Sequence, residues 1–330
     1  MKRSLSGIKP TGSPHLGNYF GFMKPAIELQ SSYDTAYFIA NYHALTSVRD
    51  SKKLHSDTLN VAACFLASGY DAQKGILYRQ SDVPQVAELT TILSNYVSVG
   101  DLTRAHAYKA AKDQGNEGTL NAGVFMYPVL MASDILIHDA DVVPVGKDQV
   151  QHLEMARAIA ARFNHHHNAP NLEDTLKEPL EMVKEEVAVV PGTDGRKMSK
   201  SYDNGIDPFA TSDKELKKQI MAIVSDSKDL EDIKDPSNCN IVALYKLFAT
   251  TEELQEMETN YRKGGYGYGH AKIALYDKVM KHFGAIREKY NSLLKNPDEI
   301  ESYLEKGAER TRTRADKVLS RVKASCGLEK

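Results

Sequence analysis

The sequence predicts an α/β protein, in which a doubly wound parallel sheet is accompanied by an inserted or appended all-α helical domain. Through the first 190 residues, short apolar segments alternate with stretches of helical periodicity. This alternation is typical of a parallel sheet with helices packed on it. After Tyr202 only helical patterns follow. In sheets of this kind, ligands bind beyond the carboxyl ends of the strands, where the strand order reverses.

The expected elements follow from these patterns. We expect strands at residues 3–8, 35–39, 75–78, 141–145 and 187–190. The helices between them are expected at residues 16–30, 51–68, 86–99 and 149–163. Further helical patterns cover residues 213–223, 240–248, 251–261, 271–290 and 297–322. The glycine-rich run at 264–269 is a flexible break between two of these helices.

Composition indicates a soluble, cytoplasmic protein with no membrane partner. A hydrophobic content of 42% and a charged content of 26% are ordinary for a globular chain, and no apolar run approaches about 18 residues. Three scattered cysteines provide neither a disulfide framework nor a zinc site. The adjacent histidines at 165–167 lack partners at metal-site spacing, so a surface helix end is expected and no metal held by protein side chains.

Two polar loops lie at opposite ends of the α/β part. The first, at residues 10–18, follows a strand and opens a helix, whose free N–H groups favour phosphate. His15 and Asn18 lie three apart, so both can point to one side of the first turn. The second loop, at residues 195–201, places two lysines and two serines behind a glycine-rich turn. Either loop alone could be an ordinary surface turn, whereas the pair together indicates a site that closes over a polyphosphate.

A third segment predicts a pocket for a flat side chain. Tyr127, Met131 and Asp134 are spaced four and three apart, so they share one helix face. An aromatic ring and a thioether can pack a flat apolar group, and a carboxylate can accept its N–H, as indole would require. A buried aspartate satisfied by neighbours is the structural alternative. The turn at 146–149 again follows a strand and opens a helix, and Asp148 there could bind ribose hydroxyls.

Together these segments resemble the class I aminoacyl-tRNA synthetases, and among them the tryptophanyl-tRNA synthetase family, along the whole chain. The resemblance implies that His15, Lys197, Ser199 and Lys200 act in catalysis. It implies an ATP site formed by Lys9, Pro10, Thr11, Gly17, Asn18, Gly146, Lys147, Asp148, Ala188, Lys197, Met198, Ser199, Lys200 and Ser201. It also implies a tryptophan pocket formed by Asp134, Tyr127, Met131, His43 and Gln149. Many relatives have Gln in place of Lys9, and some have an aromatic in place of Leu5.

The resemblance further implies ATP-dependent ligation of L-tryptophan to tRNA(Trp) through tryptophanyl-adenylate, with Mg2+ accompanying ATP. It implies a Rossmann-like catalytic domain at 1–205, a helical anticodon-binding domain at 206–292, and a C-terminal helix at 293–330 that packs back towards the catalytic domain. The basic residues of that helix are expected to contact tRNA phosphates, and the protein is expected to be a homodimer. The alternatives are a tyrosyl-tRNA synthetase and a small-molecule nucleotidyltransferase of the same superfamily.

Overall fold

A parallel sheet is the centre of the computed structural model, which describes residues 1–105, 108–109, 112, 120–146, 149–167, 175–183 and 190–329. Its strand order is β3-β2-β1-β4-β5. The strands are β1 (Arg3–Ile8), β2 (Asp34–Ile39), β3 (Ile76–Arg79), β4 (Val142–Val145) and β5 (Leu180–Val183), and every pairing is parallel. The order reverses direction between β1 and β4. The predicted doubly wound sheet is therefore confirmed, and its switch point lies between these two strands.

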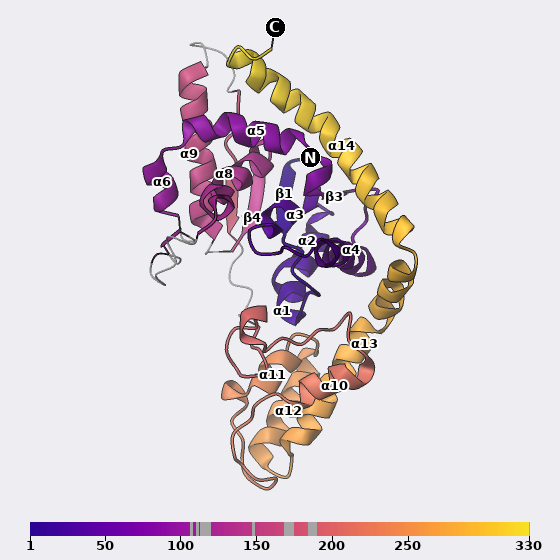
Figure 1. Cartoon of the computed structure of the whole chain (residues 1–330). Coiled ribbons are helices and arrows are strands. Elements are labelled where there is room, and N and C mark those ends of the chain that lie inside the picture. The colour runs from indigo at the N-terminus through magenta and orange to yellow at the C-terminus, as the bar shows by residue number, and fades with distance from the viewer. Residues whose placement is uncertain are drawn as a thin grey trace.

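Both faces of the sheet are buried, as the central strand β2 shows. Along β2, Ala36 and Phe38 belong to one apolar cluster, whereas Tyr37 and Ile39 belong to the other. The first cluster includes residues of α5 (Gln85–Leu93), α8 (Ala122–Leu136) and α9 (Val150–His167). The second includes residues of α2 (Lys24–Leu29) and α4 (Ser51–Ala67). Figure 1 shows the resulting layers around the sheet.

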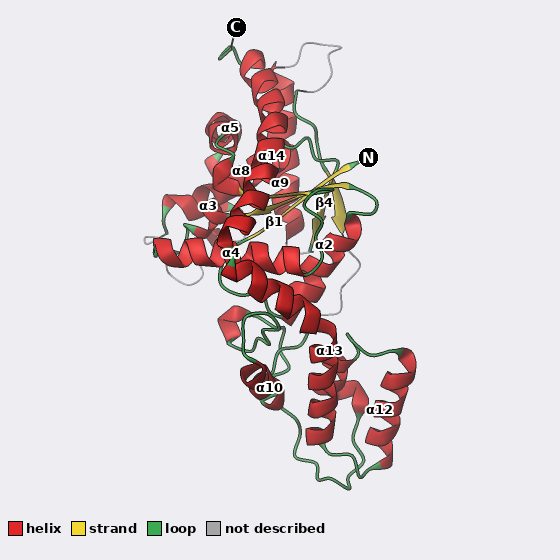
Figure 2. Ribbon diagram, turned by 90° about the vertical axis from the view of Figure 1, so that its right-hand side faces the viewer, coloured by secondary structure: helices red, strands yellow, loops and turns green. Residues whose placement is uncertain are grey.

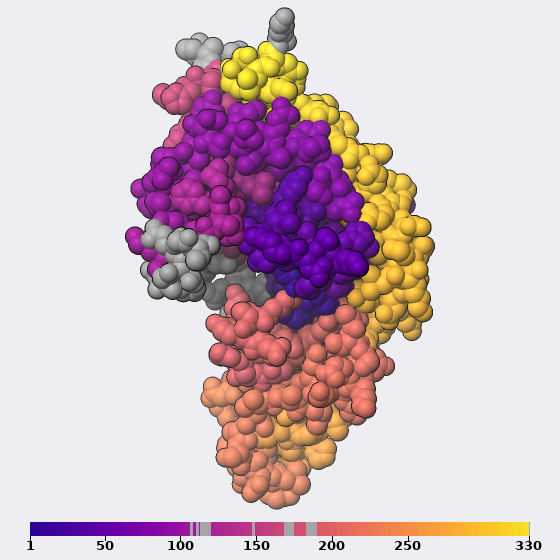
Figure 3. Space-filling view, in the orientation of Figure 1, coloured from indigo at the N-terminus to yellow at the C-terminus, as the bar shows by residue number. Residues whose placement is uncertain are grey.

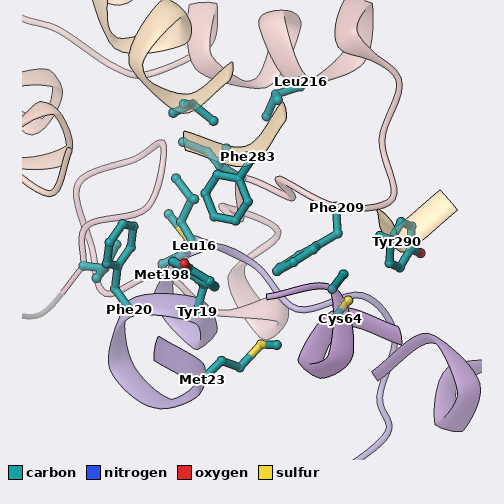
Figure 4. Close-up of a cluster of buried hydrophobic side chains, with 14 of the residues drawn as sticks. Leu16, Tyr19, Phe20, Met23, Cys64, Met198, Phe209, Leu216, Phe283 and Tyr290 are labelled. Atoms are coloured by element: carbon teal, nitrogen blue, oxygen red, sulfur yellow. The ribbon is translucent and has the colours of Figure 1, made fainter. Parts of the chain in front are cut away.

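A helical lobe extends from one end of the sheet domain, as the space-filling view makes clear (Figure 3). Its elements are α10 (Asp213–Met221), η7 (Pro236–Asn238), α11 (Asn240–Tyr245), α12 (Thr251–Lys263) and α13 (Tyr268–Lys295). An aromatic cluster joins the two parts (Figure 4). The ring of Phe283 on α13 lies 4.8 Å from that of Tyr19 and 5.4 Å from that of Phe209, both in edge-on geometry. The helical lobe is thus packed directly behind the segment that follows the first polar loop.

The last helix, α14 (Pro297–Ser325), returns along the outer side of β3 (Figures 1 and 2). The approach is closest at Gly307, where an added Cβ would lie 1.9 Å from the Leu77 carbonyl oxygen and 3.3 Å from the Leu77 nitrogen. In a strand, these two atoms of one residue point to the same side. α14 therefore covers the free backbone edge of β3.

Arginines hold α14 in this position. Arg310 donates to the backbone oxygens of Ala72, Gln73, Lys74 and Gly75. Three more arginines of α14 bind at separate places along the catalytic part: Arg312 donates to the Asp82 carbonyl, Arg314 to the Asp34 carboxylate and Arg321 to the Asp139 carboxylate. These four arginines therefore bind the chain's own catalytic part, and contact of this helix with tRNA phosphates stays a prediction.

The expected helix at 16–30 is divided into three pieces. It consists of α1 (Leu16–Asn18), a π-helical turn η1 (Tyr19–Met23) and α2. Pro25, in the first turn of α2, has no N–H to bond to the carbonyl four residues earlier, so one α-helical hydrogen bond is missing where the π-helical turn meets α2.

The expected helix at 86–99 is also interrupted. α5 ends at Leu93, where Ser94 and Asn95 side chains bond to carbonyls of its last turn. The 3-10 turn η3 (Ser94–Tyr96) follows, and Ser98 caps a new helix, α6 (Val99–Thr103). Polar side chains that bind backbone groups thus end one helix and start another.

The sequence prediction missed one strand, and a second expected strand lies mostly outside the described residues. β5 contains only four residues with a central Glu181, and Leu180 is 60% exposed, so the edge strand lacks an apolar pattern. Of the expected strand at 187–190, residues 187–189 lie outside the described part of the chain.

Candidate active site

Two cavities of about 450 Å³ each lie at the carboxyl edge of the sheet, beside the switch point between β1 and β4. The β1 residues Leu5, Ser6 and Gly7 form part of the first cavity. The second lies between the two polar loops. Lys9, which directly follows β1, lines both. The two cavities are therefore neighbours, as the sites for two substrates that react with each other must be.

The first cavity gathers all five residues expected around the amino acid, from α3 (Asn41–Ala44), α8 and the start of α9: His43, Tyr127, Met131, Asp134 and Gln149. Apolar side chains form most of the remaining wall, including Leu5, Phe38, Val124, Ile135 and Val143. A mostly apolar cavity with a few convergent polar groups is typical of a small-molecule site. The size and lining suit a flat ring that carries one donor.

Asp134 is a fully buried carboxylate in this cavity, with an exposed fraction of 0%. Its Oδ2 accepts a hydrogen bond from His43 Nε2 at 2.8 Å. Gln80 Nε2 donates to Oδ1 at 2.8 Å and to Oδ2 at 2.9 Å. Burial raises the pKa of the Asp134 carboxyl group, and the bonds from His43 and Gln80 act in the opposite direction.

Gln80 was not among the predicted site residues. It is fully buried in the 3-10 turn η2 (Gln80–Asp82), immediately after β3. The rule that polar residues at the carboxyl ends of parallel strands form the site would have found it. The signal was weak, because a glutamine in the stretch Arg79-Gln80-Ser81-Asp82 looks like part of a solvated turn.

His152 is a second residue that the prediction missed. It lines the first cavity, bonds to the Tyr127 hydroxyl through Nε2, and lies 3.0 Å from Gln149 Oε1 through Nδ1. An amide oxygen only accepts, so Nδ1 carries the proton and Nε2 accepts from Tyr127. Burial raises the pKa of the Tyr127 hydroxyl to about 12, which keeps it a donor. Two predicted pocket residues are thus joined through one histidine.

The first loop is held by a reciprocal cap at the start of α1. His15 Nδ1 accepts the Asn18 backbone N–H at 3.2 Å, and Asn18 Oδ1 accepts the His15 backbone N–H at 3.2 Å. A backbone N–H can only donate, so the neutral ring carries its proton on Nε2. Burial, with a smaller contribution from Lys200, lowers the pKa of His15 to about 4. At neutral pH, His15 therefore has an uncharged Nε2–H donor in the second cavity.

The second loop contacts the first directly. The Gly17 N–H donates to Met198 Sδ at 3.4 Å, and Met198 is only 4% exposed. Lys200, at the start of the 3-10 turn η6 (Lys200–Tyr202), donates to the Thr11 carbonyl at 2.7 Å. Figure 4 shows Met198 beside Leu16 at the start of α1. The structure therefore brings the two predicted loops together.

A buried asparagine, also missed in the prediction, shapes the second loop. Asn204 is 2% exposed, and its Oδ1 accepts the Ser199 N–H at 2.8 Å. Its Nδ2 donates to Asp194 Oδ1 at 2.6 Å and to the Lys197 carbonyl at 3.2 Å. One side chain thus binds the loop at Asp194, before the lysine-rich stretch, and at Lys197 and Ser199 within it.

Most of the residues predicted to bind ATP lie in the described part of the chain. Eight of them line the second cavity: Lys9, Thr11, Asn18, Lys197, Met198, Ser199, Lys200 and Ser201. Pro10 is buried beside them, and Gly146 follows β4 and accepts the Gln149 N–H at 2.9 Å. Lys147, Asp148 and Ala188 lie outside the described residues.

The second cavity favours an anion. Among its described lining residues are three lysines and several hydroxyl groups, and none is a carboxylate. Elsewhere in the described chain, no group of three His, Cys, Asp or Glu side chains could hold a metal ion. Over the same residues, no helix is both long and apolar enough to cross a bilayer.

Comparison with known proteins identifies the family. Residues 2–284 match the family model of class I tRNA synthetases for W and Y. The chain is 47% identical to the tryptophan–tRNA ligase of Fusobacterium nucleatum over 328 aligned residues. The alignment covers 99% of this chain and 98% of that protein. The chain belongs to the tryptophan–tRNA ligases. A second tryptophan–tRNA ligase, from Campylobacter jejuni, is 47% identical over 326 residues, with 99% of this chain and 100% of that protein covered.

Solved structures of tryptophanyl-tRNA synthetases have the same fold. The chain is similar to the Campylobacter jejuni enzyme complexed with ADP and tryptophan, with a TM-score of 0.92, 47% identity, and coverage of 99% of this chain and 100% of the other. The Mycoplasma pneumoniae tryptophanyl-tRNA synthetase gives a TM-score of 0.80 at 27% identity, with 99% and 98% covered. The predicted synthetase class and α/β fold are confirmed, and the two alternatives from the sequence are set aside.

Proposed function

We propose that this tryptophan–tRNA ligase forms tryptophanyl-adenylate from tryptophan and ATP across its two cavities, and then passes the acyl group to tRNA(Trp). One observation carries the site assignment: a buried carboxylate, Asp134, lies in a mostly apolar cavity next to an anion-favouring cavity between two loops. Lys9 lines both, at the place where the substrate carboxylate and the α-phosphate would meet. The chain is an ATP-using ligase of class I, and the roles of single residues are our proposal.

The chemistry requires no protein nucleophile. The tryptophan carboxylate attacks the α-phosphorus of ATP, a bond to that phosphorus forms, and the bond to the pyrophosphate oxygen breaks. His15 contributes an uncharged Nε2–H donor. Lys197, Ser199 and Lys200 contribute charge and donors where the pyrophosphate leaves. Catalysis is then mostly positioning and stabilisation of phosphate charge.

Mg2+ is part of this proposal as the companion of ATP. The described lining of the second cavity has no carboxylate, so phosphate oxygens rather than protein side chains would hold the ion. The bound ion would supply further neutralisation of the phosphate charge.

Selection of tryptophan would depend on Asp134. A site built to bind a buried N–H rejects an analogue that lacks it, because the carboxylate is left without its partner. Phenylalanine has no such donor, and the phenol of tyrosine carries its hydroxyl at a different position on a smaller ring.

Tryptophan-dependent ATP–pyrophosphate exchange tests the proposal, with tyrosine and phenylalanine as control substrates. Asp134→Asn should lower kcat/KM for tryptophan by about 10-fold to 150-fold, which corresponds to a loss of about 1.5–3 kcal/mol for a bond to a charged acceptor. Its KM for ATP should remain near that of the wild type. If kcat/KM for tryptophan is unchanged, Asp134 does not recognise the indole.

The proposal extends to the rest of the assembly: a cytoplasmic homodimer in which residues 206–292 contact the anticodon of a tRNA charged by the other subunit. The apolar residues of the segment 80–99 are largely used in the chain's own core, so few of them are left for a dimer contact. Val99 is 69% exposed and remains available for it. Light scattering over a wide concentration range should give the mass of two chains, and a fully active monomer would contradict the cross-subunit arrangement.

A further inference from the structure

The buried glutamine behind the first cavity has a fixed orientation. Gln80 Oε1 accepts the backbone N–H of Tyr42 at 3.1 Å. Because that N–H can only donate, the amide oxygen must face Tyr42, and the amide nitrogen must face Asp134. Gln80 Nε2 then donates to both oxygens of Asp134, at 2.8 and 2.9 Å. The contact is therefore set by the backbone of α3 on one side and by the carboxylate on the other.

These contacts leave a defined acceptor position on the carboxylate. Each carboxylate oxygen can accept about two hydrogen bonds. Among the described residues, Asp134 Oδ2 accepts from His43 and Gln80, whereas Oδ1 accepts from Gln80 only. The remaining acceptor position is thus on Oδ1.

We propose that Gln80 is a positioning residue, which fixes the plane and the ionised form of Asp134 so that Oδ1 receives the N–H of the substrate ring. The inference rests on the proposed function, in which Asp134 recognises tryptophan. Gln80 itself acts through Asp134 and has no role in the chemistry.

The segment that carries Gln80 is anchored from outside the cavity. Arg79 bonds to Asp82 at 3.0 Å and to Glu301 of α14 at 3.1 Å. The Asp82 carbonyl accepts from Arg312 of α14 at 2.9 Å. A 3-10 turn held at both ends in this way cannot shift without moving α14, so the amide of Gln80 meets Asp134 in a prepared geometry.

The charges near Asp134 determine what pH does to this arrangement. Among the described residues, the titratable groups that face it are His43 on α3 and Tyr78 on β3, and burial raises the pKa of the Tyr78 hydroxyl, which keeps it neutral. Lys9, Tyr127 and His152 line the same cavity. The bonds from Gln80 favour the ionised form of Asp134. Their loss should therefore make tryptophan use more sensitive to acid.

Two substitutions at one position should respond to pH in opposite directions. In Gln80→Leu the carboxylate loses its amide donor, so KM for tryptophan should rise about tenfold and rise further as pH falls. In Gln80→Glu the pair of carboxyl groups shares one proton near neutral pH, so the new group still donates to Asp134. Its KM for tryptophan should stay within about threefold of the wild type near neutral pH and rise as pH increases.

The matched control is Gln85→Leu. Gln85 Nε2 donates to Asp316 Oδ1 at 2.7 Å, so this change removes an amide–carboxylate bond of the same kind outside the cavity. KM for tryptophan and for ATP would be measured by pyrophosphate exchange between about pH 6 and 9, together with the thermal midpoint of each variant. We expect the Gln85 variant to match the wild type in KM at every pH.

The outcomes separate this inference from the proposed function. If Asp134→Asn loses tryptophan use while Gln80→Leu keeps the wild-type KM and pH profile, the positioning role is overturned and the function stands. If both Gln80 variants change KM by the same factor at every pH, their effect is only structural and the inference is equally overturned. If Asp134→Asn is fully active, the proposed role of Asp134 fails first. If the leucine variant does not fold, Gln80→Glu alone still tests the positioning role, because its KM for tryptophan should rise as pH increases.

Discussion

Replacing Gly307 by alanine should destabilise the protein, although alanine is the better helix former. The new Cβ would lie 1.9 Å from the Leu77 carbonyl oxygen and 2.7 Å from its carbon. Both atoms belong to the backbone of β3, so the clash cannot be relieved by rotating a side chain. To restore even a 3.0 Å contact, α14 and β3 must separate by about 1.1 Å. Overpacking of this kind costs about 1–3 kcal/mol, whereas the gain in helix propensity is about 1 kcal/mol. Taking the upper end, we expect a net loss of about 2 kcal/mol.

Gly284→Ala is the matched control, because Gly284 also lies inside a helix, α13, but nothing lies within 4 Å of its added Cβ. It should stabilise the protein by up to about 1 kcal/mol. Urea unfolding of both variants and the wild type measures the difference. The Gly307 variant should also show a raised KM for tryptophan, because a displaced α14 loosens η2. If its urea midpoint equals or exceeds that of the wild type, the tight contact between α14 and β3 is wrong.

Three further results are expected. Lys200→Ala should slow adenylate formation in single turnovers by about 10²-fold to 10³-fold with little change in tryptophan binding, because its charge acts on the leaving pyrophosphate; a wild-type rate would remove the loop from catalysis. His15 stays neutral in the folded chain down to about pH 4, whereas in the unfolded chain it takes up a proton near pH 6.5. The free energy of unfolding should therefore decrease as the pH is lowered from about 6.5 to about 4, and it should decrease less steeply in His15→Gln. Glu301→Gln should raise KM for tryptophan by no more than about fivefold, because Arg79 still has its bond to the Asp82 carboxylate. Arg314→Gln, at the opposite end of the sheet, should leave that KM unchanged.

Periodicity predicted the sheet and most helices because both faces of the sheet are buried and the helices are amphipathic. Strand β1 was predicted with its observed bounds, Arg3–Ile8. The failures have local causes that an apolar pattern does not carry. A π-helical turn precedes α2 where Pro25 lacks an N–H, and the four-residue edge strand β5 has an exposed Leu180. Both depend on hydrogen bonds and neighbours rather than on hydrophobicity.

Residue types on one helix face placed Tyr127, Met131 and Asp134 together, and the family resemblance added His43 and Gln149. All five line one cavity, and their roles stay a prediction. Their own partners were not predictable, since the contact of Gln80 with Asp134 joins positions 54 residues apart. Charge counting did not reveal the intramolecular role of the α14 arginines, because a basic residue such as Arg310 looks the same in the sequence whatever it binds. The structure shows that Arg310 donates to four backbone carbonyls.

The position of α14 along β3 has a consequence for how the molecule is made. β3 is an outer strand of the sheet, and the helix that covers its edge follows every other described element in the chain. During synthesis, the sheet and the substrate cavities can form while that edge is still bare, because domains fold as their residues emerge from the ribosome. Unpaired strand edges invite association with other chains. A stalled or prematurely ended nascent chain would therefore expose the unpaired edge of β3, which is prone to association, beside a loosened η2. Only when the final helix has been made can it cover this edge and hold η2 in place at the pocket.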